Sequence, residues 1–296
     1  MIIKEHINVK DDRLIDGLTP VVWIMDQMEK SVDQEVTIDF SDTRFISPVF
    51  ALSFIVYLTR CGKQIAFTNV SGYLERIGLG IGGIKPDTMR QTEFMAELEK
   101  YASKTYIPII DFAAGRNSDA KEVVSSIVEN MIIQQLNIQS NVANGLKYMI
   151  DETLDNITEH SESDRGYIFA QAYPTKGFLD VCIADRGVSL LGSYEKLPDN
   201  EILSDMEAIK AANRGLSSKN LPDAENRGFG IRTSKQMLIH GLGGQYLMIS
   251  GSSLYLKSCN LDTFYSMPHG LRWNGTIVAL RIPYHSSSFN YINYIE

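Results

Sequence analysis

A polar run from Glu152 to His160 has the residue types and the spacing of a magnesium nucleotide site. Glu152, Asn156 and His160 are four residues apart, so they lie along one face if the segment is a helix. The amide oxygen of Asn156 is a hard, neutral ligand that suits Mg²⁺. The carboxylate of Glu152, one helical turn away, can polarise an attacking water. The solvated face of an ordinary amphipathic helix explains the same pattern.

Asp185 and Thr276 each stand at one end of an apolar, strand-like segment. Asp185 follows residues 178–184, and Gly187 comes two positions later. A carboxylate there can accept a hydrogen bond from an adenine amino group, and a glycine lets the base approach the backbone. Thr276 precedes the apolar residues 277–280, so its hydroxyl could join Asp185 at the base. In isolation, a plain turn and a strand-start threonine are the simpler explanations.

Two glycines, Gly228 and Gly230, open a predicted helix at residues 230–240. Backbone N–H groups at a helix N-terminus attract an anion, and the helix dipole adds to the attraction. The net charge of the chain is −8, but basic residues dominate around this helix: Arg214, Lys219, Arg227, Arg232 and Lys235, against Asp223 and Glu225. A bound triphosphate would explain this local excess. A surface helix with a glycine-rich entry is the alternative.

In their order along the chain, these four motifs resemble the N box, the G1 box, the G2 box and the terminal Gly-Thr strand of GHKL ATP-binding domains. That superfamily includes gyrase, heat-shock chaperones, histidine kinases and MutL, and the resemblance covers roughly residues 106–284. It implies Mg²⁺ and ATP as cofactors, with Glu152 as general base, Asn156 as Mg²⁺ ligand and Asp185 as the adenine-reading residue. The other nucleotide contacts that it implies come from Gly187, Lys219, Gly228, Gly230 and Thr276.

One position departs from the pattern of that superfamily. The G1 box usually reads Asp-x-Gly-x-Gly, and its second glycine is Ser189 here. Residues 186–227 are mostly polar and punctuated by glycine, which is typical of a functional lid, here at about residues 187–227. Residues 215–219 resemble a lid motif that reaches the phosphates. We therefore expect lid motion or phosphate approach to differ from that of the superfamily.

The elements expected around the motifs divide the chain into three parts. Residues 1–84 alternate strand-like and helix-like segments, which predicts a small α/β domain. Residues 85–104 are expected to form a connector with one helix. Residues 105–296 begin with helices and end with strands, which predicts a helix layer on one mixed sheet. For this last part the resemblance implies the α/β sandwich known as the Bergerat-type ATP fold.

The individual elements follow from hydrophobic spacing and from capping and turn residues. Strands are predicted at 35–40, 64–70, 106–112, 166–173, 178–184, 245–250, 253–257 and 275–282. Helices are predicted at 14–29, 48–60, 72–77, 93–104, 118–136, 142–160, 199–212 and 230–240.

Residues 39–49 resemble the strand-to-helix phosphoacceptor loop of STAS domains, the sulphate transporter and anti-sigma antagonist family. In regulated members that loop carries an Asp-Ser pair before the helix. Here Ser47 and Pro48 occupy those places, so the usual acceptor hydroxyl is missing. The resemblance implies a binding or dimerisation module that is not phosphorylated there. Ser47 could be modified instead, but the pattern favours a role as the cap of the helix that Pro48 opens.

Composition argues against several other classes of protein. Hydrophobic residues make up 44% and charged residues 22%, as in soluble globular proteins, and the net charge of −8 argues against nucleic-acid binding. No segment has the length and apolar character of a membrane span or the pattern of a signal peptide, so a cytoplasmic protein is expected. Cys61, Cys182 and Cys259 lack the spacing of a zinc site.

Three functions share the same candidate residues. The first is an ATPase switch, whose lid closes on Mg-ATP and alters contacts with a protein partner or a second copy, the partner binding through the N-terminal domain. The second is a protein Ser/Thr kinase of the anti-sigma type, in which a protein hydroxyl replaces water as the phosphoryl acceptor. The third is a module that senses ATP without turnover. Histidine autophosphorylation is not expected, because only His6 lies upstream of Glu152.

Overall fold

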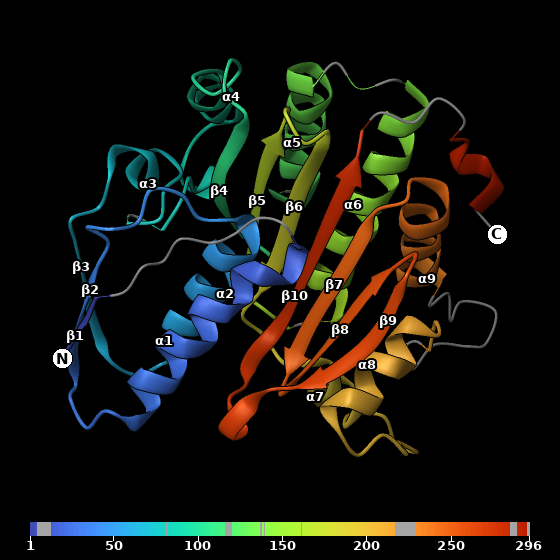
Figure 1. Ribbon diagram of the computed structural model, residues 1–296. Coiled ribbons are helices and arrows are strands. Elements are labelled where there is room, and N and C mark those ends of the chain that lie inside the picture. The colour runs from blue at the N-terminus through green and yellow to red at the C-terminus, as the bar shows by residue number, and fades with distance from the viewer. Residues whose placement is uncertain are drawn as a thin grey trace.

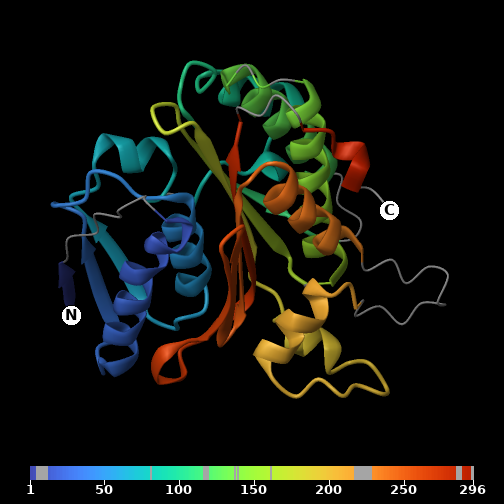
Figure 2. The ribbon, with the colours of Figure 1, turned by 45° about the vertical axis from the view of Figure 1, so that its right-hand side comes forward.

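The computed structural model describes residues 1–4, 13–80, 82–115, 120–136, 138, 140–160, 162–216, 229–284 and 289–294. These residues form a mixed α/β protein with a three-stranded parallel sheet and a seven-stranded antiparallel sheet. One set of helices lies between the two sheets, and a second set covers the far face of the larger sheet (Figure 1, Figure 2). The protein therefore has four layers, in the order sheet, helices, sheet, helices.

The N-terminal residues form the smaller sheet, whose strands run parallel in the order β1-β2-β3. Parallel neighbours need a long crossover connection, and helices supply it here. The elements in chain order are β1 (Ile2–Lys4), η1 (Leu14–Gly17), α1 (Leu18–Lys30), β2 (Glu35–Asp39), α2 (Pro48–Leu58), β3 (Gln64–Thr68) and α3 (Gly72–Arg76). They confirm the alternation of strand and helix expected from the sequence.

Ser47 caps α2, as the sequence predicts. Its hydroxyl accepts a hydrogen bond of 3.2 Å from the Phe50 N–H, and Pro48 takes the first helical position. Ser47 is only 4% exposed. The hydroxyl is therefore used in building the fold.

Helix α2 is buried along its length because it lies between the two sheets. Residues 48–57 are all buried, which agrees with a sequence that is apolar on every face. The indole N–H of Trp273, in the larger sheet, donates a 2.9 Å hydrogen bond to the Ser53 carbonyl in α2. The N-terminal elements and one face of the larger sheet consequently share one hydrophobic core. The domain limits 1–84, 85–104 and 105–296 stay a prediction.

The larger sheet has the strand order β4-β5-β6-β10-β7-β8-β9. Its strands are β4 (Tyr106–Ala113), β5 (Arg165–Tyr173), β6 (Phe178–Asp185), β7 (Gln245–Gly251), β8 (Ser253–Ser258), β9 (Leu261–Ser266) and β10 (Trp273–Pro283). All six neighbouring pairs are antiparallel, so the expectation of a mixed sheet was wrong. Short hairpins join β5 to β6 and β7 to β8 to β9. Strand β10 returns between β6 and β7, antiparallel to both.

The helices that follow the connector cover the far face of this sheet. They are α5 (Ala120–Leu136), α6 (Ser140–His160), α7 (Leu190–Tyr194), α8 (Asp205–Asn213) and α9 (Phe229–Gln236), which continues as a π-helical turn at Met237–Gly241. Leu146, Met149, Ile150 and Leu154 of α6 are buried against the sheet. Their spacing of three and four residues leaves the next face of α6 for the polar residues of the predicted site.

Some elements differ from those predicted. The connector carries η2 (Pro86–Thr88) and α4 (Gln91–Glu99), in place of a helix at 93–104, and α8 replaces a longer predicted helix at 199–212. Strand β9 and helix α7 were not predicted, because neither has a clear apolar period. None of the helices in the described ranges has the length and apolar character needed to cross a membrane.

Candidate functional site

A row of polar residues crosses three neighbouring strands at one end of the larger sheet. Asp185 ends β6, Thr276 lies near the start of β10, and Ser250 lies in β7. The strand register brings them side by side, since Thr276 pairs with Ser250 and Ile277 pairs with Ala184. Each of the three lies two residues from a core side chain on the helix-covered face. The row therefore faces the helix layer that contains α6 and α9.

Asp185 is held by two backbone donors and is 1% exposed. Its Oδ1 accepts from the Gly187 N–H at 2.7 Å, and its Oδ2 accepts from the Thr276 N–H at 3.0 Å. Burial raises the pKa of this carboxyl to about 7, although the two backbone hydrogen bonds favour the ionised form. A carboxylate has about four acceptor positions, so these bonds leave capacity for a ligand amino group.

Gly275 and Ser250 support Asp185 from β10 and β7. Gly275 has a φ of 89°, and a Cβ there would lie 2.4 Å from the Asp185 carbonyl oxygen, so the position requires glycine. The Ser250 hydroxyl accepts from the Leu190 N–H at 2.8 Å and lies 3.2 Å from the hydroxyl oxygen of Thr276. Ser250 was not predicted as a site residue. The available signal was a hydroxyl at the end of the apolar run of β7.

Ser189, where the family pattern has a second glycine, begins α7. Its hydroxyl accepts from the Gly192 N–H at 3.3 Å, and its φ of −67° is accessible to any residue. This backbone therefore needs no glycine at position 189. The serine starts a helix directly after the turn that carries Asp185. Whether lid motion differs from that of the superfamily stays a prediction.

A second group of predicted residues meets where α6 lies against the start of α9. A Cβ on Gly230 would lie 1.7 Å from Oε2 of Glu152, so the first turn of α9 can approach this carboxylate only because residue 230 is glycine. Burial and the neighbouring Glu152 carboxylate raise the pKa of Tyr148, one turn earlier in α6, to about 12. The Asn156 amide nitrogen donates to the Glu152 carbonyl at 2.6 Å. The amide oxygen of Asn156 is not used in that bond.

Helix α6 and strand β6 both end at the same end of the larger sheet (Figure 1). Helix α6 ends at His160, and β5 begins a few residues later at Arg165. Gly166 of β5 pairs with Asp185 of β6. The C-terminal half of α6, which contains Glu152 and Asn156, therefore leads directly into the strand beside Asp185.

Several predicted residues cannot be compared with the structure. Lys219 and Gly228 lie outside the described residues, as do residues 217–228 of the expected lid and the side chain of His160. Lys235, by contrast, contacts protein. Its ammonium group donates to the main-chain and side-chain oxygens of Asn213, both at 3.1 Å, at the end of α8. Burial lowers its pKa to about 8. Lys235 therefore gives no support to the phosphate explanation of the basic cluster.

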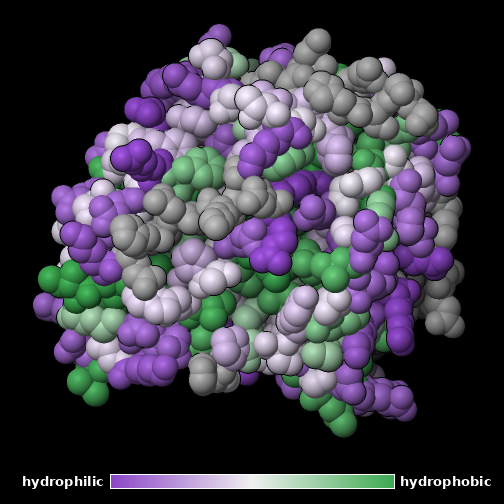
Figure 3. Space-filling model, viewed as in Figure 1, coloured by the Kyte–Doolittle hydropathy of each residue, from purple (hydrophilic) through white to green (hydrophobic). Residues whose placement is uncertain are grey.

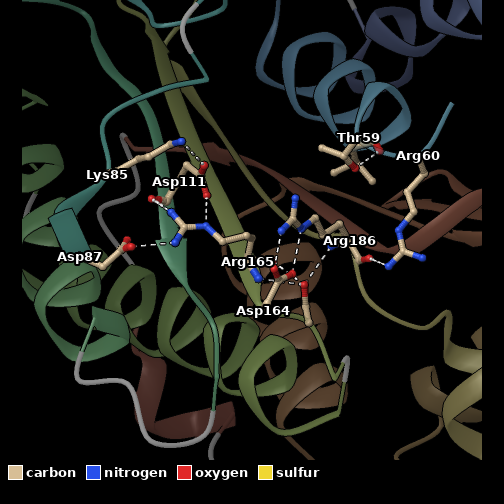
Figure 4. A network of polar contacts seen from close by, with 10 residues as sticks. Thr59, Arg60, Lys85, Asp87, Asp111, Asp164, Arg165 and Arg186 are labelled. Carbon is tan, nitrogen blue, oxygen red and sulfur yellow. Dashed lines mark hydrogen bonds and ion pairs between the residues drawn. The ribbon is translucent and has the colours of Figure 1, made fainter. Parts of the chain in front are cut away.

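Arg186, between Asp185 and Gly187, is held on three sides (Figure 4). Its N–H donates to the Ser163 hydroxyl at 3.3 Å, and its guanidinium pairs with Asp164. Its carbonyl oxygen accepts a 2.8 Å hydrogen bond from Nη2 of Arg60, which follows α2. No local sequence pattern identifies Arg60 as part of this site, because its hydrogen-bond partner is 126 residues away in the sequence.

A scan against models of protein families finds no match for this chain, and a search of curated proteins finds none either.

Proposed function

We propose that the chain binds Mg-ATP beside Asp185, between the larger sheet and helices α6 and α9, and that it acts as an ATP-dependent switch. One observation supports this most directly. Asp185 is a buried carboxylate on the helix-covered face, fixed by two backbone N–H groups and flanked by hydroxyl groups. Such a carboxylate can accept a hydrogen bond from the exocyclic amino group of adenine.

The residues on α6 and α9 fit the phosphate end of the same ligand. Mg²⁺ is usually held by one or two protein oxygens together with phosphate oxygens, and the amide oxygen of Asn156 would be such a ligand. Bound there, the metal would supply positive charge to the phosphates. Glu152, packed against Gly230 at the start of α9, would accept the proton of the attacking group. Lys219 and Gly228 would add phosphate contacts, and this assignment rests only on the resemblance to GHKL domains.

The finer fold assignments belong to this proposal. The order of α6, β6, α9 and β10, and the helix layer on one face of the sheet, support a Bergerat-type GHKL domain for residues 105–296. The parallel sheet with α1 and α2 on one face supports a STAS-like unit before it. We place the protein in the cytoplasm, without nucleic acid as a partner.

A protein partner, or a second copy, would bind the outer surface of the N-terminal unit, because α2 is buried. Ile2 in β1 is 72% exposed, and Val32, just before β2, is 92% exposed. Hydrophobic side chains reach the surface over this sheet at the left edge of the molecule (Figure 3). Exposed apolar side chains of this kind are suited to contact with another protein.

Calorimetry with Mg-ATP tests the proposal. We expect heat of binding in Mg²⁺, with affinity weakened by EDTA, and we expect Asn156→Ala to weaken the Mg²⁺-dependent part of binding by about 10- to 100-fold. Asn260→Ala is the matched control, because this exposed asparagine lies in the β8–β9 turn at the opposite end of the sheet. No heat with saturating Mg-ATP would overturn the proposal. An affinity unchanged by Asn156→Ala would remove the metal assignment alone.

Gly230→Ala is expected to lower turnover by about tenfold or more, because a 1 Å displacement of a catalytic group can cost about 100-fold in rate. The added methyl group would overlap Oε2 of Glu152, 1.7 Å from the ideal Cβ position, and push the carboxylate away. Steady-state kinetics should show a fall in kcat larger than the change in Mg-ATP affinity. Gly80→Ala is the control, since a Cβ there meets nothing within 4 Å. Full activity of Gly230→Ala would contradict the proposed position of Glu152.

A further inference from the structure

We propose that Arg60, from the N-terminal unit, is a positioning residue for the nucleotide-binding turn at Asp185. Nucleotide occupancy and the seating of the N-terminal unit on the larger sheet would then depend on each other. This inference rests on the proposed function, because the turn is a ligand site only if ATP binds at Asp185.

A single peptide group connects Arg60 to Asp185. The carbonyl oxygen of Arg186 accepts the hydrogen bond from Arg60, at 2.8 Å, and the next N–H, that of Gly187, donates to Asp185 Oδ1 at 2.7 Å. Both atoms belong to the same planar peptide unit. A donor fixed on the oxygen therefore orients the N–H that holds the carboxylate. It also polarises that N–H, since hydrogen bonds in a chain strengthen one another.

The main chain at Arg60 is held firmly by α2, so that a movement of the N-terminal unit also moves the Arg60 guanidinium group. Arg60 follows α2, whose residues 48–57 are buried between the two sheets. The hydrogen bond from Trp273 to Ser53 ties α2 to β10, the strand that supplies Thr276. A shift of the N-terminal unit against the larger sheet would therefore displace the guanidinium from the turn. Conversely, a ligand that moves Arg186 would pull on the end of α2 (Figure 4).

The other arginines near the turn pair with carboxylates other than Asp185, whereas the charge of Arg60 acts on Asp185. Arg186 pairs with Asp164, and Arg165 pairs with Asp87 and Asp111, which also lies near Lys85. Burial raises the pKa of Asp185, whereas the charge of Arg60 lowers it. Removing the guanidinium should therefore loosen the turn and also make the ionised form of Asp185 less favourable.

The test compares Arg60→Met, Arg60→Lys and Arg76→Met with the wild-type chain. Arg76 is an exposed arginine of α3 in the same unit, so Arg76→Met controls for loss of one surface charge. Arg60→Met should weaken Mg-ATP binding about two- to fivefold, the size expected for loss of one exposed hydrogen bond. It should also move the pH dependence of binding to higher pH and speed hydrogen exchange at the Gly187 amide without nucleotide. Arg60→Lys should restore part of each effect.

Two outcomes separate failure of this inference from failure of the proposed function. If the wild type binds Mg-ATP and Arg60→Met matches Arg76→Met in affinity, pH profile and exchange, Arg60 does not position the turn. If neither the wild type nor any variant binds Mg-ATP, the proposed function fails, and the inferred coupling to nucleotide fails with it. Hydrogen exchange alone then shows whether Arg60 holds the turn as a structural contact.

Discussion

Asp185→Asn is expected to weaken Mg-ATP binding by at least about 100-fold while leaving a folded protein, because sites built to hydrogen-bond a ligand lose large factors when the pairing is broken. Asp185 accepts from the N–H groups of both Gly187 and Thr276. An asparagine offers one oxygen and one NH₂ group, so one backbone donor would face another donor. The charge that favours an amino-bearing base is also lost.

Calorimetry, together with thermal unfolding, checks this result. Asp42→Asn, at an exposed position in the turn after β2, is the control for loss of one carboxylate. The variant should unfold cooperatively and bind Mg-ATP far more weakly than the control does. Wild-type affinity in folded Asp185→Asn protein would mean that Asp185 has only a structural role, closing the turn and fixing the start of β10.

The raised pKa of Asp185, about 7, gives this prediction a pH signature. As the pH falls below about 7, the carboxyl takes up a proton, so Mg-ATP affinity should fall by up to about tenfold per pH unit. The free energy of unfolding should change in the opposite direction and rise as the pH falls. A carboxyl whose folded-state pKa is raised contributes stability that is present below the unfolded value and is lost as the pH rises towards 7. Asp185→Asn should remove both dependences.

The fold was predictable where a local pattern decides it. Helix α6 shows buried residues at helical spacing with Glu152 and Asn156 beside them, and β6 is an apolar run that stops at Asp185. Pairing between strands has no such local pattern. The prediction of a mixed sheet was wrong because the position of β10 between β6 and β7 depends on contacts between residues far apart in sequence. The edge strand β9, with half of its residues polar, gave no apolar alternation to read.

The candidate site divides in the same way. Spacing along α6 and the glycine at position 230 pointed to groups that the structure brings into contact, and Asp185, Gly187 and Thr276 are joined by hydrogen bonds. Ser250 and Arg60 were missed, because each acts through a partner reached only after folding. The count of basic residues around α9 included Lys235, and such a count cannot show that its ammonium group donates to Asn213 at the end of α8.

Glu152→Gln is expected to reduce phosphoryl transfer by about 100- to 10,000-fold, the range for loss of a general base, with little change in Mg-ATP affinity. Glutamine keeps the shape of the side chain, so the packing against Gly230 remains, but it cannot accept the proton of the attacking group. Measurements of kcat and of the dissociation constant separate the two effects. Glu99→Gln, on the exposed side of α4, is the control. Turnover equal to that of wild type would refute the assignment of Glu152.

The destination of the labelled γ-phosphate in the wild-type reaction then identifies the acceptor. Free phosphate means that Glu152 activates water, as in an ATPase switch. Label on a protein means that it activates a hydroxyl group, as in a Ser/Thr kinase, because the two reactions share every nucleotide contact and differ only in the attacking group. Glu152→Gln should suppress either reaction. Binding without transfer in the wild type would instead indicate an ATP sensor, in which Glu152→Gln changes neither affinity nor any product.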